Sequence, residues 1–485
     1  MNQLIVYPQP EGARERRDFK VQVRQLDEDW QEPFVYEAKV DMHQIRQASM
    51  AYFDMFGKVE VRVECLTTRP ERVVIRPLSA AIPLVCDGNS ISFTLSKPCK
   101  LSIEVNGDRF GNLHLFANPL EKLPPLPDDP GVLLIKPGIH RMEDIKRLAS
   151  MPDALSGQCP HILYFAPGIH YVEETIIRIP SNTTVYVAGG AVVVGSFVCD
   201  RVKNVVIRGR GIIDLSTFHR YSAFRGIRIK FCENVTVEGL VLLDPPHYSI
   251  YIGKSSHIHI SNFKSFSTKG WCDGIDMMAS SDIEIDDVFL RTSDDCIAVY
   301  ASRWDYRGDT RRVTVRNSIL WADVAHPLMM GTHGDHQRSG DVIEDIRFEN
   351  IDILEHHEPQ ENYWGAMAIN AGDKNTIRRV VYDNIRVEEF ELGQLIDIRV
   401  IRNKDYNPEP GHSIEDISFR NIIYLGRNIN PNRIYGFDAE RQVKGVVFEN
   451  LRIHGELVLK PEQGNFDINA FAQEITFTVR NEAKK

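Results

Sequence analysis

Three aspartates and a histidine lie at matched positions in three short segments of this chain. Asp273 stands two residues before an isoleucine, Asp295 does the same in the next segment, and His326 stands two residues before a leucine. Residues two apart on a strand point to one face, so these polar groups would share a face if the segments stack as neighbouring strands. Asp294 precedes Asp295, where a turn would aim it at the same place. The sequence therefore predicts one small patch with three carboxyl groups and an imidazole.

Such a patch has the groups that cleave a glycosidic bond. Stacked strands lie about 4.8 Å apart, and carboxylates this close cannot all ionise freely, so at least one should keep its proton near neutrality. A protonated acid can donate to the leaving oxygen while ionised neighbours activate water. Two other interpretations stay open: aspartates that only bond the backbone of turns, and a calcium site. His326 is the wrong ligand for calcium.

The elements that must position these residues are copies of a sequence repeat. Each copy reads apolar, any, apolar, polar, then Asn, Gly or Asp, and successive copies end 23 to 37 residues apart. Strand-like alternation at a bounded period is typical of a solenoid with one coil per repeat. We therefore predict a right-handed parallel β-helix whose terminal Asn, Gly or Asp takes a left-handed turn conformation. The copies end at Gly209, Gly239, Asn262, Asp287, Asn317, Asn350, Asn384, Asn421 and Asn450.

The sequence around the repeats divides the chain into three parts. Residues 1–118 contain short alternating stretches broken by turns, which predict an N-terminal β-sandwich domain. Residues 119–131 are rich in proline and form the predicted linker. Residues 132–485 form the predicted catalytic β-helix of this all-β protein, and a helical segment at residues 142–148 would cap its open end. The repeat period lengthens after residue 287, so we expect longer loops and the binding groove there.

Composition argues against several classes of function. The chain has 485 residues, 43% of them hydrophobic and 26% charged, as in ordinary globular proteins. Its formal net charge of -10 argues against a nucleic-acid-binding surface, which would be basic. We see no signal peptide in residues 1–8 and no stretch of membrane-spanning length, and therefore expect a cytoplasmic protein without a membrane partner. The cysteines form no C-x-x-C pair and are expected in the core.

The polar segments resemble two related families of glycoside hydrolases. Asp273 with the following glycine is similar to the Asn-Thr-Asp-Gly motif of the polygalacturonases, glycoside hydrolase family 28, and Asp294-Asp295-Cys296 is similar to their Gly-Asp-Asp-Cys motif. His326 corresponds to the histidine of their Gly-His-Gly motif, displaced by an insertion at residues 304–309. The N-terminal sandwich is more like the dextranase and isopullulanase family, family 49, which acts on neutral glucans. The resemblance covers most of residues 130–455.

The resemblance implies a glycoside hydrolase that cleaves a poly- or oligosaccharide by an inverting, carboxylate-based mechanism. It departs from the polygalacturonases where they place Arg-Ile-Lys, which binds a galacturonate carboxylate, because residues 365–370 contain no basic residue. A neutral sugar, or an acidic one held by some other arginine, is therefore expected. Because we see no secretion signal, we expect short imported oligosaccharides, with loops after residue 300 closing one end of the groove and giving exo action.

Each catalytic candidate receives a role in this hypothesis. Asp294 would be the general acid, and Asp273 and Asp295 the base that polarises a water. His326 would tune the proton of the acid or hold a sugar hydroxyl. Inversion calls for carboxyl groups about 6.5 to 9.5 Å apart, a gap that neighbouring coils would supply. No organic cofactor and no metal are expected, and the oligomeric state is left open.

Further candidates are aromatic side chains and histidines that would contact the sugar. An aromatic ring near a solenoid turn stacks on a sugar or packs against the next coil, and a loop histidine is often only solvated. The candidates for substrate binding are His247, Tyr248, Trp271, Trp304, His333 and Trp364. The rival hypotheses are a polysaccharide lyase, which would need calcium and a nearby basic residue, and a non-catalytic carbohydrate-binding β-helix.

Overall fold

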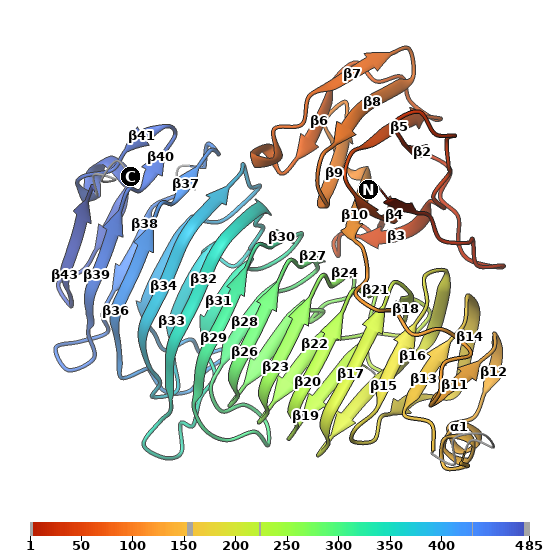
Figure 1. Ribbon diagram of the computed structural model, residues 1–485. Coiled ribbons are helices and arrows are strands. Elements are labelled where there is room, and N and C mark those ends of the chain that lie inside the picture. Colours follow the sequence, from red (N-terminus) through yellow and green to blue (C-terminus); the bar gives the residue numbers. More distant parts are fainter. Residues whose placement is uncertain (1–2, 153–158, 223–224, 429, 480–485) are drawn as a thin grey trace, which may run out of the picture.

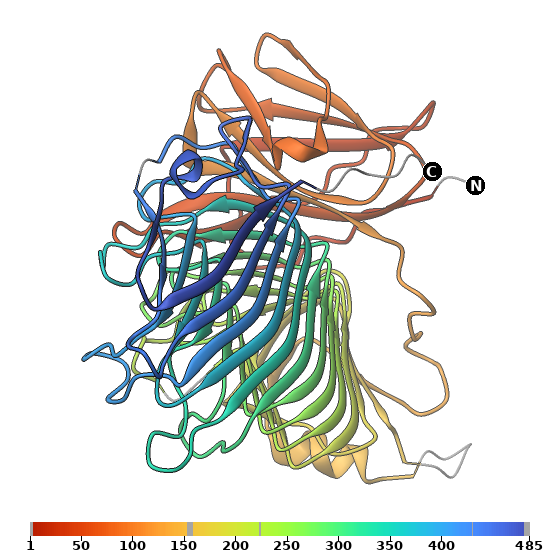
Figure 2. The ribbon, with the colours of Figure 1, turned by 90° about the vertical axis from the view of Figure 1, so that its left-hand side faces the viewer.

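The protein is a long coil of parallel strands with a β-sandwich seated on one flank (Figure 1). The structure, a computed structural model, describes residues 3–152, 159–222, 225–428 and 430–479. Figure 2 shows the coil nearly end-on, with the sandwich covering its upper side. The predicted fold class, a parallel β-helix with an N-terminal β-sandwich, is confirmed. No helix among the described residues is long and apolar enough to cross a membrane.

The sandwich consists of two sheets whose strands alternate buried and exposed residues. In β2 every second residue is buried, so one face of each sheet lies in a shared core and the other faces outward. One sheet has the order β1-β4-β10-β9-β6 with β3 paired to β4, and the other has the order β2-β5-β8-β7. The strands are β1 (Gln3–Ile5), β2 (Phe19–Gln25), β3 (Tyr36–Val40), β4 (Arg46–Phe56), β5 (Val59–Cys65), β6 (Val73–Arg76), β7 (Leu84–Asp87), β8 (Ser90–Leu95), β9 (Cys99–Val105) and β10 (Asp108–Pro119), with the 3-10 turn η1 (Leu78–Ala80).

The coil has three ladders of parallel strands, and each ladder forms one wall. The first ladder is β11 (Val132–Ile135), β13 (Ile162–Phe165), β15 (Thr184–Val187), β17 (Lys203–Gly209), β20 (Glu233–Glu238), β23 (Ser256–Ser261), β26 (Ser281–Asp286), β29 (Thr310–Arg316), β32 (Val342–Glu355), β34 (Thr376–Val387), β36 (Ser413–Arg420), β39 (Val443–Glu449) and β43 (Ala472–Thr478). This wall contains the nine copies of the sequence repeat.

The second ladder faces the sandwich, and the third forms the opposite wall. The second is β12 (Gly138–His140), β14 (Gly168–Arg178), β16 (Ala191–Asp200), β18 (Ile212–Asp214), β21 (Val241–Leu243), β24 (Lys264–Phe266), β27 (Phe289–Thr292), β30 (Ile319–Ala322), the ends of β32 and β34, β37 (Ile423–Tyr424), β40 (Arg452–Ile453) and its hairpin partner β41 (Glu456–Leu457). The third continues from the ends of β14 and β16 through β19 (Ile227–Lys230), β22 (Ile250–Gly253), β25 (Ile275–Met278), β28 (Ile297–Tyr300), β31 (Leu328–Gly331), β33 (Met367–Ala371), β35 (Ile396–Val400), β38 (Asn432–Tyr435) and β42 (Phe466–Ile468).

One helix and one 3-10 turn complete the coil among the described residues: α1 (Met142–Ala149) and η2 (Pro461–Gly464). Figure 1 shows α1 at the first coil, and its Met142 and Ile145 are buried in the core of the solenoid. The helical segment therefore lies where the sequence places it. Strand β10 of the sandwich ends at Pro119, and strand β11 of the coil begins at Val132. The domain boundaries at residues 118 and 132 stay predictions.

The repeat is explained by the backbone at its last position. All nine terminal residues have positive φ, and the seven Asn and Asp residues among them fall between 49° and 58°. Asparagine tolerates this left-handed conformation better than other residues with a side chain. The amides also bond from coil to coil, as Asn350 does to Asn317 at 2.7 Å and Asn384 does to Asn350 at 3.2 Å. The predicted turn role of these residues is confirmed.

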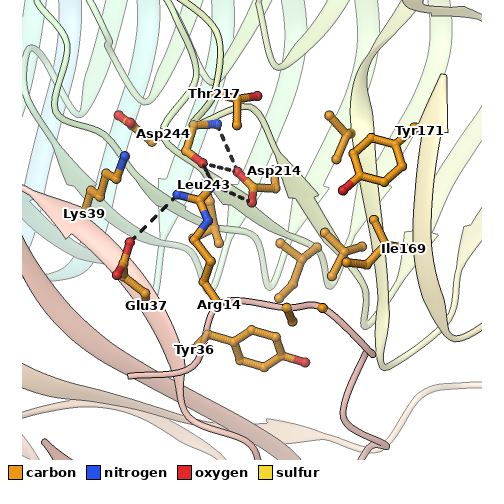
Figure 3. A pocket seen from close by; sticks show the side chains of 16 residues that line it. Arg14, Tyr36, Glu37, Lys39, Ile169, Tyr171, Asp214, Thr217, Leu243 and Asp244 are labelled. Atoms are coloured by element: carbon orange, nitrogen blue, oxygen red, sulfur yellow. Dashed lines mark hydrogen bonds and ion pairs between the residues drawn. The ribbon is translucent and has the colours of Figure 1, made fainter. Parts of the chain in front are cut away.

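A buried ion pair and buried hydrogen bonds join the sandwich to the coil. Arg210, 2% exposed, places its Nε 2.9 Å from the carboxylate of Asp54 in β4, and Arg291 on β27 donates to Asn112 of β10 at 3.1 Å. A cavity of about 210 Å³ remains at this seam (Figure 3), where Arg14 bridges the sandwich to Asp214 of the coil. Arg14 also contacts Ser216 and Glu37 in the lining, so the cavity is a gap in the packing between the two domains.

We expect Asn350→Ala to lower the free energy of unfolding by about 2 kcal/mol, because alanine is strained at a φ of 52° and loses both ladder hydrogen bonds. Asn350→Gly, which fits the same φ, should cost less. Urea unfolding followed by circular dichroism measures both variants. Equal losses for the two substitutions would show that the left-handed backbone contributes nothing at this position.

Candidate active site

The three predicted segments stack at one edge of the third ladder. The first residues of β25, β28 and β31 pair directly, so Asp273, Asp295 and His326 occupy the same position on three successive coils. Their matched placement is confirmed, but the strand alternation used to predict it is wrong. Ile275 and Ile297 point into the solenoid core, whereas the polar residues belong to the turn before each strand. Stacked turns, not a shared strand face, bring the polar groups together.

The carboxyl groups of Asp273, Asp294 and Asp295 form a compact cluster. One oxygen from each lies within 4.8 Å of the others. Asp273 and Asp295 are 4% exposed, while Asp294 is more accessible. Both oxygens of Asp294 accept backbone N–H groups, from Asp295 at 3.0 Å and from Trp271 at 3.2 Å. The backbone thus fixes the Asp294 carboxyl at the opening of the cluster.

His326 is an imidazolium paired with Asp295. Its Nδ1 lies 2.7 Å from Asp295 Oδ1, and its Nε2 makes a short hydrogen bond to the carbonyl oxygen of Tyr363. Both partners are acceptors, so both ring nitrogens must carry hydrogen. Burial alone would lower the pKa of His326, but the Asp295 carboxylate raises it to about 9. Since both nitrogens bond within the protein, His326 tunes the acids and does not hold a sugar hydroxyl.

The surroundings separate the protonation states of the acids. Burial, followed by the charge of Asp295, raises the pKa of Asp294 to about 7. Burial and the neighbouring carboxylates also raise the pKa of Asp273. The carboxylate of Asp295 is stabilised by the imidazolium and by the hydroxyl of Tyr300 at 3.3 Å. Carboxyl groups whose pKa values are pushed apart can serve as acid and base in one reaction.

The cluster is tighter than the spacing expected for inversion. Acid and base were expected about 6.5 to 9.5 Å apart, but their nearest oxygens lie within 4.8 Å. A water bonded to two oxygens at about 2.8 Å each fits between oxygens up to about 5.6 Å apart. Asp273 and Asp295 are therefore spaced to hold one water between them.

A fourth carboxyl, on Asp276, belongs to the same group and was missed by the sequence reasoning. It lies on β25, is fully buried, and has Arg303 as an ion-pair partner at 3.8 Å. Burial and Asp295 raise its pKa, and Arg303 opposes the shift. Alternation supplied the signal that was not used: Ile275 points into the core, so the next residue must face the groove.

Aromatic candidates border the acid cluster on its exposed side. Trp271 and Trp304 are 53% and 44% exposed, which is unusual for tryptophan and leaves ring faces accessible. His247 lies 6.3 Å from the Trp271 ring. Tyr248 is buried and stacks on Trp304 at 5.8 Å, so it supports that ring from below. Four of the six predicted binding residues are thus gathered at the cluster.

The other two candidates lie further along the coil. His333 contacts Tyr300 edge-on at 5.1 Å, and burial together with Arg303 lowers its pKa. Trp364 donates its indole N–H to the carbonyl of Glu358 at 2.8 Å. These two residues therefore belong to the wall beyond β28, and their contact with a sugar stays a prediction.

The outer face of the third ladder forms the floor of the groove beside the acids, and beyond β28 this floor is covered. Ala298, Met329 and Ala368 follow one another along β28, β31 and β33, face away from the core, and are 0% exposed. Tyr363, from the loop after β32, packs in the same cluster and stacks on Tyr406, from the loop after β35, at 4.7 Å. The long loops expected after residue 287 thus roof the floor beyond the acids.

The three clustered aspartates have the composition of a cation site, and their surroundings decide against that interpretation. Calcium takes six to eight oxygen ligands, whereas Asp295 is already engaged by an imidazolium and Asp294 by two backbone N–H groups. An imidazolium cannot ligate a metal. Proton chemistry suits these side chains better than metal binding.

Comparison with known proteins identifies the family of this chain. Residues 173–463 match the family model for Glycosyl hydrolases family 28. The chain belongs to glycoside hydrolase family 28. The match spans β14 to η2 and contains the whole acid cluster.

Individual relatives of this family 28 protein are distant. Exopolygalacturonase B of Aspergillus niger is 22% identical over 197 residues, which cover 39% of this chain and 42% of that protein. The chain thus spans less than half the length of that curated relative. Dex49A from Penicillium minioluteum has a TM-score of 0.63 at 16% identity, covering 98% of this chain and 96% of its own. A family 28 exopolygalacturonase of Yersinia enterocolitica has a TM-score of 0.51 at 12% identity, with 87% and 94% covered. These structural likenesses support the fold.

We expect stability to fall with rising pH as His326 loses its proton. The pKa of His326 is raised from 6.5 to about 9 in the folded protein. The protonated imidazole therefore contributes fully to the free energy of unfolding below pH 6.5, and this contribution is lost as the pH rises to about 9. The loss should amount to about 3 kcal/mol. Urea midpoints measured across this range test it, with His326→Gln, which has no ionisable group, as the control. If the urea midpoint of the wild-type protein falls with pH no more steeply than that of His326→Gln, His326 is not an imidazolium in the folded protein.

Proposed function

We propose that this protein is an inverting glycoside hydrolase that acts on an oligosaccharide. One observation carries the proposal: Asp294, with a pKa of about 7, opens onto the groove beside two acids, one of which is paired with an imidazolium. Membership of family 28 supports the same reaction class. The alternatives are a polysaccharide lyase and a carbohydrate-binding β-helix without turnover.

The reaction follows from the protonation states. Asp294 donates its proton to the glycosidic oxygen as the bond to the anomeric carbon breaks, which removes the cost of an alkoxide leaving group. Asp273 and Asp295 hold a water between them, and Asp295 takes up its proton as the oxygen attacks that carbon. The His326 imidazolium lies 2.7 Å from the Asp295 carboxylate and so holds the base in position. Trp271 and Trp304 offer ring faces on which a sugar can stack.

The covered floor beyond β28 supports exo action. A groove that is roofed on one side of the acids accepts the end of a chain and leaves no room for a polymer to pass through. Short oligosaccharides fit this arrangement, and the cytoplasmic location inferred from the sequence stays a prediction.

The activity should fall as the pH rises through about 7, because Asp294 must be protonated to act as the acid. Asp294→Asn keeps the shape and should lower kcat by roughly 10² to 10⁴, with the smallest loss on substrates whose leaving group needs no proton. Asp273→Asn should be equally slow on all substrates, since water activation is always required. Reducing-sugar release and NMR of the first-formed anomer measure these effects.

Three outcomes would reject the proposed mechanism. Retention of the anomeric configuration would make one carboxylate a nucleophile. An unsaturated sugar in the product, together with inactivation by a chelator, would indicate a lyase. Unchanged affinity of Asp294→Asn without any turnover by the wild-type protein would leave only carbohydrate binding.

Exo action predicts that monosaccharide or a short terminal product appears before the viscosity of a polymeric substrate drops. Chromatography of early digests against viscometry makes the comparison. Tyr363→Ala, which opens the roof over Ala368, should shift the products toward longer fragments. A rapid early fall in viscosity by the wild-type protein would show that the groove is open at both ends.

A further inference from the structure

The sandwich carries a cleft on the side that is turned away from the coil. The sheet β1-β4-β10-β9-β6 contacts the coil, whereas the sheet β2-β5-β8-β7 forms the outer layer. Figure 1 shows β5, β7 and β8 at the top of the sandwich, away from the coil. A cleft of about 560 Å³ lies on the outer face of this sheet, between strand β7 and the loop that follows β2. We call it the sandwich cleft. None of its lining residues belongs to the coil.

Polar side chains form the floor of the sandwich cleft. Val61 on β5 and Phe93 on β8 are buried in the core of the sandwich. Because side chains alternate along a strand, their neighbours point outward. Arg62 pairs in register with Ser92, and Thr94 lies on the same face of β8; all three line the cleft. The floor therefore offers a guanidinium group beside two hydroxyl groups.

Apolar side chains form the two walls of the sandwich cleft. One wall is the loop at residues 26–33, which folds back on β2 because the N–H of Gln31 donates to the carbonyl of Val23 at 2.9 Å. This fold places the half-buried ring of Trp30 at the cleft. The opposite wall is β7, where Val85 is 68% exposed. Apolar walls over a floor with a few polar groups are typical of small-ligand sites, and an indole ring packs well on the C–H face of a sugar.

Two arginines hold the Trp30 ring, and only one of them has a carboxylate partner. The guanidinium carbons of Arg24 and Arg62 lie 4.5 and 4.6 Å from the ring centroid. Arg24 pairs with Glu60 at 2.7 Å. Arg62 has neither an ion pair nor a hydrogen bond to any residue that the structure describes. The ring thus orients a guanidinium group in the cleft before a ligand arrives, which lowers the entropy cost of binding an anion there.

We propose that the sandwich cleft is a second, non-catalytic carbohydrate site, and that it binds a sugar carrying a carboxylate. Arg62 takes the carboxylate in a bidentate hydrogen bond, while Trp30 and Val85 pack on the C–H faces of the sugar. The site goes beyond the proposed hydrolase function, because it needs no turnover. Buried contacts fix the sandwich on the coil, so a polymer held in the cleft keeps its neighbouring chain ends at a high effective concentration near the groove.

Hydrogen–deuterium exchange tests the site by its position, apart from any binding in the groove. The full-length Asp294→Asn variant would be mixed with oligogalacturonides, with the same compounds after reduction of their carboxyl groups to alcohols, or with poly-glutamate. We expect oligogalacturonides to protect residues 26–33 and 83–87, the two walls of the cleft. Half-maximal protection by the reduced compounds should need at least about tenfold more ligand, the factor that one charge-assisted hydrogen bond provides. Poly-glutamate, which has no sugar ring, should give no protection.

Substitutions in the sandwich cleft separate the charge from the stacking surface. Arg62→Gln should abolish the preference for oligogalacturonides over their reduced forms, because it removes the guanidinium group. Trp30→Ala should raise the concentration for half-maximal protection of residues 83–87 by about tenfold for both kinds of compound. Arg69→Gln, in the exposed turn after β5, makes the same charge change outside the cleft and should leave the protection as it is. Thermal melts of each variant confirm folding.

The proposal is overturned if the two walls exchange at the same rate with and without oligogalacturonides, or if the reduced compounds protect them equally well. Protection by poly-glutamate at the same concentration would make the cleft a site for acidic peptides instead. Wild-type turnover separates these failures from failure of the hydrolase proposal. Hydrolysis without protection of the walls would keep the enzyme and reject the second site, and protection without hydrolysis would keep the second site and reject the enzyme.

Discussion

In-register hydrogen bonding between successive coils is the constraint on which the rest of this structure depends. Gly274 donates to the carbonyl of Asp295 at 2.8 Å, and Cys296 donates to that of His326 at 2.8 Å. Equivalent turn positions must therefore recur one strand spacing apart, whatever side chains they carry. Acids placed at such positions repel one another, and the histidine at the third coil offsets this because it becomes a cation there. The acid–base chemistry and the charge balance have one geometric origin.

The same constraint explains why the loop after β28 brings a positive charge to the stacked acids. Four buried or half-buried carboxyl groups in one place need more positive charge than one imidazolium supplies. That loop brings Arg303 to 3.8 Å from Asp276, and its neighbour Trp304 forms part of the exposed wall. Arg303 also lies over the rings of Tyr300 and Tyr248 at 4.6 and 5.7 Å. One insertion thus stabilises the acids and shapes the binding surface beside them.

Features repeated at every coil could be predicted from the sequence, and features that occur once could not. The terminal Asn residues predict the left-handed turns because every copy of the repeat needs a positive φ at its last position. Asp273, Asp295 and His326 were found because they share one offset from the strands. Arg303 and Glu358 come from loops of irregular length, and which way a loop side chain points depends on contacts distant in sequence.

The sandwich supports the acid cluster through the strand that leads into it. Arg291 on β27 is fully buried and donates to Asn112 of the sandwich and to Asp323 of the next coil. β27 ends at Thr292, whose hydroxyl donates to the carbonyl oxygen of Asp294 at 2.6 Å. A buried guanidinium is stable only while all its partners stay in place, so the sandwich cannot move without disturbing the turn that presents the acid. The N-terminal strands therefore hold the turn that carries Asp294 in place, even though the sandwich lies against another wall of the coil.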